Sequence, residues 1–437
     1  MKIVVIGTGY VGLVSGTCFS EFGFDVTCVD KDEGKIARLT QGEIPIYEPG
    51  LDDLVKRNSE AGRLHFTTDL ASHVPEADVV FIAVGTPTRR GDGHADLSYV
   101  YAAAEEVAEN LHGYTVVVTK STVPVGTGRE LHKIISQTNP QAEFDIASNP
   151  EFLREGSAIN DFMRPDRVVV GTTQPRAIEM MRALYRPLYL IETPILFAEL
   201  ETAELIKYAA NAFLAVKISF INQIADLCEE VGANVHEVAK GMGLDKRIGG
   251  KFLHAGPGYG GSCFPKDTLA LVKTAEMHDI ALPMVEGVVR YNDARKLAMA
   301  DRIKDALGGD VGGKKIAVLG LAFKPETDDM RDSPALSILP QLVADGALVT
   351  AYDPAAMEEA KPLLPASITY ASNAADTLPD ADCVVVITEW NEFRALSAQR
   401  FASLMAGRVI VDLRNLYDGD KMRNEGFAYH SIGRPQR

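Results

Sequence analysis

The segment that most constrains the fold is residues 2–12, KIVVIGTGYVG, in which an apolar run leads into three glycines. Gly7, Gly9 and Gly12 have the spacing G-x-G-x-x-G, and the stretch that follows them, LVSGTCFSEFG, has a helical pattern. The glycines alone would be weak evidence. A strand before them and a helix after them favour a Rossmann unit, whose helix N-terminus binds a pyrophosphate, over a tight turn without a ligand.

The next predicted strand, DVTCVD, ends in Asp30, which stands 18 residues after Gly12. A carboxylate at this point of a Rossmann unit binds the adenosine ribose hydroxyls of NAD, and it would repel the additional phosphate of NADP. The sequence therefore predicts that the N-terminal domain binds NAD.

Two further predicted strands end in small or hydroxylic residues. They are ADVVFIAVGTP, residues 77–87, and YTVVVTKSTVP, residues 114–124. In an open parallel sheet the ligand lies beyond the carboxyl ends of the strands. We therefore expect Thr86, Thr122 and the loop NPEFLREG, residues 149–156, to border the same cleft.

The chain then repeats three strand segments in the same order. The matching pairs are KIVVIG (2–7) and KIAVLG (315–320), VTCVD (26–30) and VTAYD (349–353), and ADVVFIAV (77–84) and ADCVVVIT (381–388). The repeat predicts a second α/β domain of similar build. After Gly320 the chain reads LAFKPETDD, without the dinucleotide glycines. The second copy could bind another nucleotide or be structural, since a fold does not fix a function.

A long helix is predicted over residues 199–232, which contain no proline and whose only glycine ends the run. Apolar residues occur on nearly every face of this helix, which indicates burial on several sides. The predicted fold class is α/β, with two doubly wound Rossmann-like domains joined by this helix. The predicted domains are residues 1–198, which bind NAD, a central helical domain over 199–305, and a C-terminal Rossmann-like domain over 306–437.

Lys207 and Asn211 are four residues apart in this helix, so they project from the same face. Their neighbours are mostly apolar. A lysine in such surroundings is commonly a surface residue whose stem packs on apolar groups while its ammonium reaches water. Beside a cleft, however, a lysine and an amide on one face could stabilise a developing oxyanion. The helical pattern leaves both interpretations open.

The segment DKRIGGKFLHAGPGYGGSCFPKD, residues 245–267, contains six glycines and two prolines, so we expect neither a regular helix nor a strand there. Long segments of this kind are usually functional or disordered, and its aromatic residues favour order. Arg247, Lys251 and Lys266 supply positive charge that could bind a diphosphate.

Cys263 is the unusual cysteine of this chain, because it lies in that glycine-rich segment. The other four lie in strand-like or helical patterns and are interpreted as small core residues; they are Cys18, Cys28, Cys228 and Cys383. Nearby lysines and helix N–H groups would favour the Cys263 thiolate, and Asp267 would oppose this unless it pairs with a lysine. A nucleophilic thiolate beside NAD suggests that an aldehyde is trapped, oxidised to a thioester and hydrolysed to an acid.

Composition narrows the class of protein further. The net charge of −16 argues against nucleic acid and anionic membranes as partners, and no apolar run approaches the ~18 residues of a membrane span. The spacing of the five cysteines fits neither a disulfide framework nor a zinc site, and we expect no metal. A strand at the first residues leaves no room for a signal peptide, so we expect a cytoplasmic protein.

Eight motifs along the chain, taken together, resemble the UDP-glucose 6-dehydrogenase family (the UDP-glucose/GDP-mannose dehydrogenases). They are GTGYVG (7–12), GEIPIYEPGL (42–51), KSTVPVGT (120–127), SNPEFLREGSA (148–158), ELIKYAANAFLA (204–215), GPGYGGSCFPKD (256–267), GLAFKPETDDMRDSP (320–334) and VDLRNLYD (411–418). Each motif alone is modest evidence, but all eight in order are specific. The resemblance covers essentially the whole chain.

The resemblance implies that UDP-glucose is oxidised twice to UDP-glucuronate, with two NAD reduced per sugar. It places Cys263 as the nucleophile and Lys207 and Asn211 at the oxyanion. Asp267, Glu151 and Thr122 match residues around the catalytic water. It also implies that the second Rossmann-like domain binds UDP.

The binding residues are likewise implied by the resemblance. For NAD they are Gly7, Gly9, Tyr10, Val11, Gly12, Asp30, Lys35, Thr86, Thr122, Glu155, Lys266 and Arg331. For the sugar nucleotide they are Glu151, Phe152, Leu153, Arg154, Glu155, Lys207, Asn211, Arg247, Phe252, Leu253, His254, Ala255, Gly256, Gly260, Lys324 and Arg414. At position 254 relatives often carry Asn or Lys, so His254 is assigned no specific side-chain contact.

The arginine of the family's DKRIG motif can reach a neighbouring subunit's site, so Arg247 implies a homodimer or a larger assembly of dimers.

Three alternative functions remain. A sister enzyme would oxidise GDP-mannose or a UDP-N-acetylhexosamine by the same cysteine chemistry. A simple two-electron dehydrogenase would use Cys263 only structurally, and a non-catalytic NAD-binding regulator would need no nucleophile. The sequence around Cys263, GPGYGGSCFPKDTLAL, favours UDP-glucose as the substrate.

Overall fold

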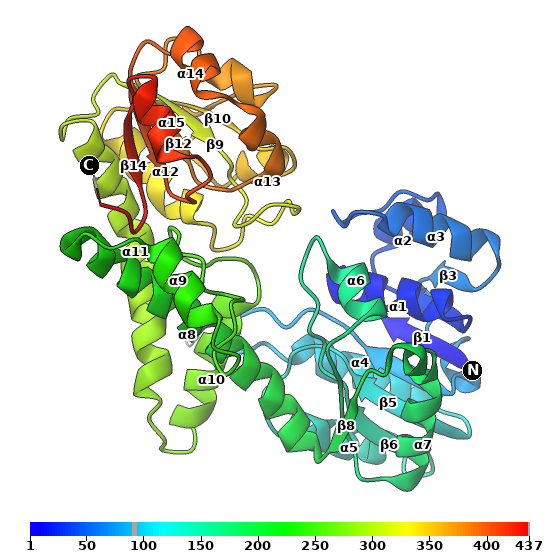
Figure 1. The fold of residues 1–437 in the computed structure, drawn as a ribbon. Coiled ribbons are helices and arrows are strands. Elements are labelled where there is room, and N and C mark those ends of the chain that lie inside the picture. The colour runs from blue at the N-terminus through cyan, green and yellow to red at the C-terminus, as the bar shows by residue number, and fades with distance from the viewer. Residues whose placement is uncertain (90–93, 436–437) are drawn as a thin grey trace. The chain divides into compact units, whose positions relative to one another are not determined.

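A computed structural model describes residues 1–89 and 94–435, and the chain divides into two compact units (Figure 1). Unit 1 comprises Met1–Ala210 and Lys273–Asp279, and unit 2 comprises Asn211–Val272 and Ile280–Arg437. The predicted long helix is confirmed as α8 (Leu200–Val231), whose residues belong to both units. The division into three domains stays a prediction.

Unit 1 contains a sheet with the strand order β3-β2-β1-β4-β5-β6-β7-β8. Its neighbouring strands are parallel, except that β6 and β7 are antiparallel. The strands are β1 (Lys2–Ile6), β2 (Asp25–Val29), β3 (Leu64–Thr67), β4 (Val79–Ile82), β5 (Tyr114–Thr119), β6 (Glu143–Ser148), β7 (Val168–Gly171) and β8 (Ile195–Ala198). The helices are α1 (Tyr10–Glu21), α2 (Glu33–Thr40), α3 (Leu51–Glu60), α4 (Ser98–Asn110), α5 (Thr127–Thr138), α6 (Ala158–Met163) and α7 (Pro175–Leu184).

The apolar strands of unit 1 are buried on both faces, as expected for a doubly wound sheet. Successive residues of β1 point to opposite faces, so Val5 belongs to the core that includes residues of α1 and α7, whereas Val4 belongs to the core that includes residues of α4 and α5. This arrangement explains why these strands are continuous apolar runs and why they could be recognised from the sequence.

Unit 2 contains the second sheet, with the strand order β11-β10-β9-β12-β13-β14 and parallel neighbours. The strands are β9 (Lys315–Leu319), β10 (Leu348–Tyr352), β11 (Thr369–Tyr370), β12 (Cys383–Val386), β13 (Val409–Asp412) and β14 (Ala428–Ser431). The helices are α9 (Val235–Gly243), α11 (Pro283–Ala306), α12 (Pro334–Ala344), α13 (Met357–Ala360), α14 (Ala398–Leu404) and α15 (Gly419–Asn424). Helix α10 (Phe264–Glu276) begins in this unit.

The predicted repeat is confirmed, because β9, β10 and β12 pair in the same order as β1, β2 and β4. The register agrees as well: the last residue of β2 pairs with the last residue of β1, and the last residue of β10 pairs with the last residue of β9. Asp353 after β10 therefore corresponds to Asp30 after β2. The α/β fold with two Rossmann-like domains and a long central helix is confirmed.

The two corresponding aspartates each accept a hydrogen bond from the loop after the first strand of their domain, but their other partners differ. The buried Asp353 carboxylate accepts hydrogen bonds from the backbone N–H groups of Leu321 and Ala322, at 2.7 and 3.0 Å, and from the indole N–H of Trp390 at 3.1 Å. Those N–H groups lie in the loop after β9, where the first copy has its dinucleotide glycines. Asp30 likewise accepts a hydrogen bond from the N–H of Thr8, the counterpart of Leu321, so the second copy differs in the additional bonds that Asp353 accepts from Ala322 and Trp390.

Among the helices of residues 1–89 and 94–435, α8 included, none combines the length and the apolar character that crossing a membrane requires.

Candidate active site

The glycine loop of unit 1 has the geometry of a dinucleotide site, and each glycine has its own role. Gly7 has φ +98°, and a Cβ there would lie 2.7 Å from the carbonyl oxygen of Ala83. A Cβ on Gly12 would lie 1.9 Å from the Gly7 oxygen, so helix α1 packs this closely only with glycine. A Cβ on Gly9 would meet nothing within 4 Å, so space remains at the N-terminus of α1 for a pyrophosphate.

Asp30 lies beside this loop, as predicted. Its Oδ2 accepts hydrogen bonds from the Thr8 N–H at 2.8 Å and the Thr8 hydroxyl at 2.7 Å, and Lys35 Nζ lies 3.4 Å away. Burial raises the pKa of the Asp30 carboxyl, but the hydrogen bonds from Thr8 and Asp32 and the charge of Lys35 outweigh this effect and hold the pKa below its ordinary value. The ionised carboxylate is the form that accepts hydrogen bonds from ribose hydroxyls.

Thr86 and Thr122 are neighbours, because the Thr86 hydroxyl donates a hydrogen bond to the Thr122 carbonyl oxygen at 3.0 Å. That they border one cleft with residues 149–156 stays a prediction. The strands before them are shorter than the predicted ranges 77–87 and 114–124. β4 and β5 end at Ile82 and Thr119, which leaves both threonines on loops beyond the carboxyl ends.

Glu48 positions the loop of residues 149–156, and sequence reasoning missed this role. Its buried carboxylate accepts hydrogen bonds from the N–H groups of Gly156 and Ala158, both at 2.7 Å, and from the Tyr10 hydroxyl. Glu48 therefore connects this loop to the first turn of α1. The GEIPIYEPGL motif contains Glu48, but no sequence pattern indicates that the N–H groups it binds lie 108 and 110 residues further along the chain.

Glu151 and Lys207 form a buried ion pair in unit 1. Glu151 Oε1 lies 3.2 Å from Lys207 Nζ, and the side chains are 5% and 3% exposed. The Phe152 ring lies 5.3 Å from the same ammonium. Lys207 is therefore not a surface lysine with its ammonium in water, and the second of the two sequence interpretations is favoured. A buried cation beside a cleft can stabilise a developing negative charge.

Lys120 is a second buried lysine near this pair. Its Nζ donates to Asn149 Oδ1 at 3.0 Å, and burial lowers the pKa of the ammonium from 10.5 to about 8, with a further lowering by the charge of Lys207 and an opposing effect of Glu151. The motif KSTVPVGT contains this lysine, but no sequence pattern distinguishes a buried lysine from an exposed one at the end of a strand.

The Lys120 pKa predicts how stability depends on pH. Between about pH 8 and pH 10.5 the unfolded chain binds more protons than the folded chain, so the free energy of unfolding rises with pH in this window. One pKa unit corresponds to about 1.4 kcal/mol, so we expect the wild type to gain about 3 kcal/mol relative to Lys120→Met across it. Urea unfolding of both proteins at the two pH values measures this gain. A stability difference that does not change with pH would contradict it.

Several predicted residues of unit 1 have partners of their own. Arg154 is exposed and pairs with Asp161 at 2.6 Å, and the guanidinium of Arg167 lies 3.5 Å from the centre of the Phe152 ring. Val11, Leu153 and Glu155 are half-buried.

In unit 2, Cys263 directly precedes helix α10, and its carbonyl oxygen accepts a hydrogen bond from the Asp267 N–H at 2.8 Å. The thiol is half-buried. A helix N-terminus favours the thiolate through its free N–H groups and its dipole. The predicted irregular segment 245–267 is thus wrong in its last residues, because α10 begins at Phe264. Pro265 and Asp267 in the first turn are ordinary features of a helix start.

Asp267 lies one helical turn after Cys263 and is 1% exposed. Its two carboxylate oxygens accept hydrogen bonds from Asn211 Nδ2 at 2.7 Å and from Lys266 Nζ at 2.8 Å. Asp267 therefore pairs with a lysine, which is the arrangement under which it would not oppose the Cys263 thiolate. This lysine, Lys266, is one of the residues predicted to bind NAD.

The structure brings several predicted sugar-nucleotide residues together in unit 2. Gly256 lies against Arg414, and a Cβ on Gly256 would be 3.3 Å from its Nη1. Arg414 donates hydrogen bonds to the carbonyl oxygens of Ile387 and Phe323, both at 2.8 Å. Lys324 Nζ lies 5.7 Å from the centre of the Phe323 ring.

The other predicted residues of this segment lie around the same loop. Leu253, Ala255 and Gly260 are buried, Phe252 is half-buried and has φ +64°, and His254 is exposed. The carbonyl oxygen of Arg331 accepts a hydrogen bond from the Gly261 N–H at 2.7 Å. The Arg331 side chain pairs with Asp329.

Arg247 is not gathered with these residues. Its side chain is 89% exposed and pairs with Asp245. The predicted catalytic residues are divided between the units: Lys207, Glu151 and Thr122 belong to unit 1, and Cys263, Asn211 and Asp267 belong to unit 2. Lys207 and Asn211 occupy successive turns of α8.

Comparison with known proteins identifies the family. Three family models match: the UDP-glucose/GDP-mannose dehydrogenase family NAD binding domain over residues 1–189, its central domain over 201–294 and its UDP binding domain over 317–419. The chain is 62% identical to the UDP-glucose 6-dehydrogenase of Rhizobium meliloti (strain 1021) over 437 residues, which is 100% of both chains. It is 49% identical to UDP-glucose 6-dehydrogenase TuaD of Bacillus subtilis (strain 168), covering 99% of this chain and 93% of that protein.

Two solved structures of sugar-nucleotide dehydrogenases have the same fold as this chain. A UDP-glucose dehydrogenase from Pyrobaculum islandicum superposes with a TM-score of 0.90 at 38% identity, covering 98% of this chain and 96% of the other. A UDP-D-ManNAc dehydrogenase from Pyrococcus horikoshii superposes with a TM-score of 0.87 at 28% identity, covering 100% of both chains. This chain therefore belongs to the UDP-glucose/GDP-mannose dehydrogenase family.

Proposed function

We propose that the protein catalyses the NAD-dependent four-electron oxidation of UDP-glucose to UDP-glucuronate through a thioester on Cys263. The observation that carries the proposal is the position of Cys263 at the start of α10, with the buried Asp267 in the first turn of this helix and its partner Asn211 on α8. A half-buried thiol at a helix N-terminus is a suitable nucleophile. The 62% identity to a UDP-glucose 6-dehydrogenase supports this sugar nucleotide.

When bound, NAD⁺ accepts a hydride from C6 of the sugar in each of two oxidations. In the first, the C6 hydroxyl loses its proton and becomes an aldehyde. The Cys263 thiolate then adds to the aldehyde carbon, which forms a C–S bond, and the carbonyl oxygen becomes an oxyanion. Loss of the second hydride from the resulting thiohemiacetal gives a thioester. Water then adds to the thioester, the C–S bond breaks, and the carboxylate and the thiolate are released.

The chain's own residues are assigned to these steps by the charges that develop. Lys207 and Asn211 would stabilise the oxyanion with a cation and an amide N–H. Asp267 and Glu151, with Thr122, would position the water and accept its proton, because each carboxylate is held in place by a nitrogen donor.

The two Rossmann-like domains would bind different nucleotides. The N-terminal copy has open space at Gly9 and a carboxylate, Asp30, for the ribose. The C-terminal copy lacks the dinucleotide glycines, and the cations beside its loop after β9 are Lys324 and Arg414, so its ligand would lie on their side. We assign UDP to this second surface, in agreement with the family description of a UDP binding domain.

The stoichiometry of NADH tests the proposed reaction. With limiting UDP-glucose and excess NAD⁺, we expect two NADH per sugar and UDP-glucuronate as the product. GDP-mannose, UDP-N-acetylglucosamine and UDP-N-acetylmannosamine serve as rival substrates in the same assay, since small side-chain differences can separate such substrates. One NADH per sugar, or a higher kcat/KM on a rival, would overturn the assignment.

We also propose that the protein is a homodimer, or a larger assembly of dimers, formed along helix α8. Phe213, Phe220 and Leu227 follow one another at seven-residue intervals, and 64%, 45% and 55% of their surfaces are exposed. Large apolar residues at this spacing form a stripe that suits a second helix. Lys217, on the same stripe, donates a hydrogen bond to the Ile248 carbonyl at 3.0 Å and so attaches the segment that carries Arg247 to α8. A second copy on this stripe would place Arg247 at the interface.

Substitution in the stripe tests the dimer. We expect Phe220→Asp to give a monomeric molar mass by light scattering after gel filtration, whereas the wild type gives twice this mass or a multiple of it. Leu348→Asp is the matched control, because Leu348 is also about half exposed but lies on β10. A monomeric wild type, or a Phe220→Asp variant with the mass of the wild type, would contradict the proposal.

We place the reaction in the cytoplasm. The proposed chemistry requires Cys263 as a free thiol, and a reducing compartment keeps thiols in this state.

A further inference from the structure

Buried polar side chains of α8 and α11 bind the backbone of the loop that leads to Cys263. We infer that Asn292, Arg295 and Asn222 are positioning residues, which fix this loop and through it the nucleophile and the UDP-sugar contacts. The inference rests on the proposed function. None of these side chains belongs to the predicted site, and all are at most 5% exposed.

Asn292 binds both backbone groups of Tyr259. Its Oδ1 accepts a hydrogen bond from the Tyr259 N–H at 2.8 Å, and its Nδ2 donates to the Tyr259 carbonyl at 3.0 Å. The single side-chain amide of Asn292 thus satisfies both the N–H and the carbonyl group of Tyr259, as a neighbouring strand does in a sheet. The Tyr259 ring packs edge-on against Phe264, the first residue of α10, with 6.0 Å between the ring centres. Since Cys263 directly precedes Phe264, a shift of Asn292 would move Tyr259 and Phe264 and with them the nucleophile.

Gly256 is bound in the same way by two side chains. Asn222 Oδ1 accepts a hydrogen bond from the Gly256 N–H at 2.8 Å, and Arg295 Nε donates to the Gly256 carbonyl at 2.8 Å. Gly256 also lies against Arg414, one of the residues assigned to UDP. A displacement of Gly256 would therefore change the sugar-nucleotide surface.

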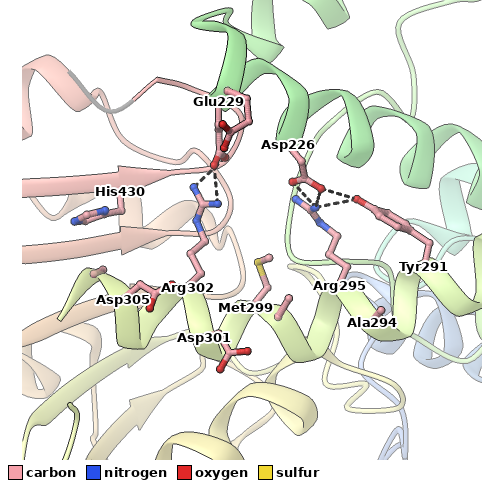
Figure 2. A pocket seen from close by; sticks show the side chains of 13 residues that line it. Asp226, Glu229, Tyr291, Ala294, Arg295, Met299, Asp301, Arg302, Asp305 and His430 are labelled. Carbon is pink, nitrogen blue, oxygen red and sulfur yellow. Dashed lines mark hydrogen bonds and ion pairs between the residues drawn. The ribbon is translucent and has the colours of Figure 1, made fainter. Parts of the chain in front are cut away.

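The Nη1 group of Arg295, which does not bind the loop, has partners of its own. Arg295 lines a groove of about 610 Å³, and Figure 2 shows the side chains of Asp226 and Tyr291 beside its guanidinium. Nη1 lies 2.7 Å from Asp226 Oδ1 and 2.9 Å from the Tyr291 hydroxyl. The planar guanidinium thus connects Asp226 on α8 with the loop, and a lysine could not bind both at once.

The contact between loop and helix is close. Gly258 has φ +124°, and a Cβ there would lie 2.9 Å from the Lys296 side chain and 3.0 Å from Asn292 Oδ1. The loop therefore follows the surface of α11 in a conformation that only glycine adopts without strain. Buried backbone groups that lose their partners are costly, so the loop has little freedom to rearrange.

The test compares Asn292→Leu and Arg295→Met with Arg302→Met. Arg302 lies on the same helix and in the same groove, but it pairs with Glu229 and does not reach the loop (Figure 2). The first two variants should raise the KM for UDP-glucose about tenfold or more, because each leaves a buried backbone group unpaired. The KM for NAD⁺ should change less than twofold, and the control should change neither.

A second readout does not depend on turnover. Iodoacetamide alkylates Cys263, and bound UDP-glucose should protect it. The concentration of UDP-glucose that halves the alkylation rate should rise about tenfold in the loop variants and stay within twofold in the control. If the wild type binds UDP-glucose but does not oxidise it, the proposed function fails while this comparison still decides the positioning role.

Conservative variants keep the test decisive if Asn292→Leu or Arg295→Met fails to fold. Asn292→Asp keeps the acceptor for the Tyr259 N–H, and Arg295→Lys keeps one donor for Gly256, so both should be intermediate between the wild type and the larger changes. The inference is overturned if loop variants and control have the same protection, or if the two KM values rise together.

Discussion

Replacement of Cys263 by serine is expected to lower the steady-state rate of NADH formation from UDP-glucose by about 10³-fold or more, because removal of a covalent nucleophile abolishes its part of the reaction. The serine hydroxyl is far less acidic than a thiol, so the start of α10 no longer supplies an anionic nucleophile. The measurement is NADH formation at saturating UDP-glucose and NAD⁺.

The control for this prediction is Cys228→Ser. Cys228 is a buried residue of α8 within the core of unit 2 and is 3% exposed. We expect this variant to keep its rate within a few-fold of the wild type and to lose only stability, about 1 kcal/mol, because a hydroxyl replaces an apolar thiol in the core. If Cys263→Ser retains more than a tenth of the activity, Cys263 is a structural turn residue.

Replacement of Lys207 by methionine is expected to have the second largest effect. Loss of the cation at the oxyanion should reduce kcat by about 10²- to 10³-fold. The same change leaves the Glu151 carboxylate buried without its ion-pair partner at 3.2 Å, which should lower the free energy of unfolding by about 3 kcal/mol.

The double variant Lys207→Met with Glu151→Gln separates these two effects. It removes the uncompensated charge, so we expect most of the lost stability to return, as measured by urea unfolding. The activity should not return, because the oxyanion still lacks its cation and the catalytic water has lost one of its two carboxylates. Recovery of kcat together with stability would show that Lys207 serves only to neutralise Glu151.

Much of the fold could be predicted because its signals are local. The strand, glycine loop and helix at the N-terminus need only neighbouring residues, and the glycines Gly7 and Gly12 are dictated by contacts within this unit. The repeat at β9, β10 and β12 could be recognised because buried parallel strands are continuous apolar runs. The placement of Asp30 follows from the same unit.

The burial of side chains depended on tertiary contacts and could not be predicted. Lys207 has apolar neighbours in the sequence, whereas Lys120 stands between Thr119 and Ser121. Neither setting distinguishes a surface lysine from a buried one. The roles of Glu48, Asn292 and Arg295 also became visible only in the structure, because their partners are backbone groups far along the chain. The start of α10 was missed because the glycines before it dominated the pattern.

The position of Asp353 has a consequence for the history of the chain and for its redesign. If the two Rossmann-like copies arose by duplication, the second differs from the first in the residues after β9 and in two additional hydrogen bonds, which Asp353 accepts from Ala322 and Trp390. Restoring the glycines alone would leave the Trp390 contact in place. A designer who wishes to make the C-terminal copy accept NAD would have to release Asp353 from Trp390 and Ala322, whereas its bond from the Leu321 N–H matches the one that Asp30 accepts from Thr8.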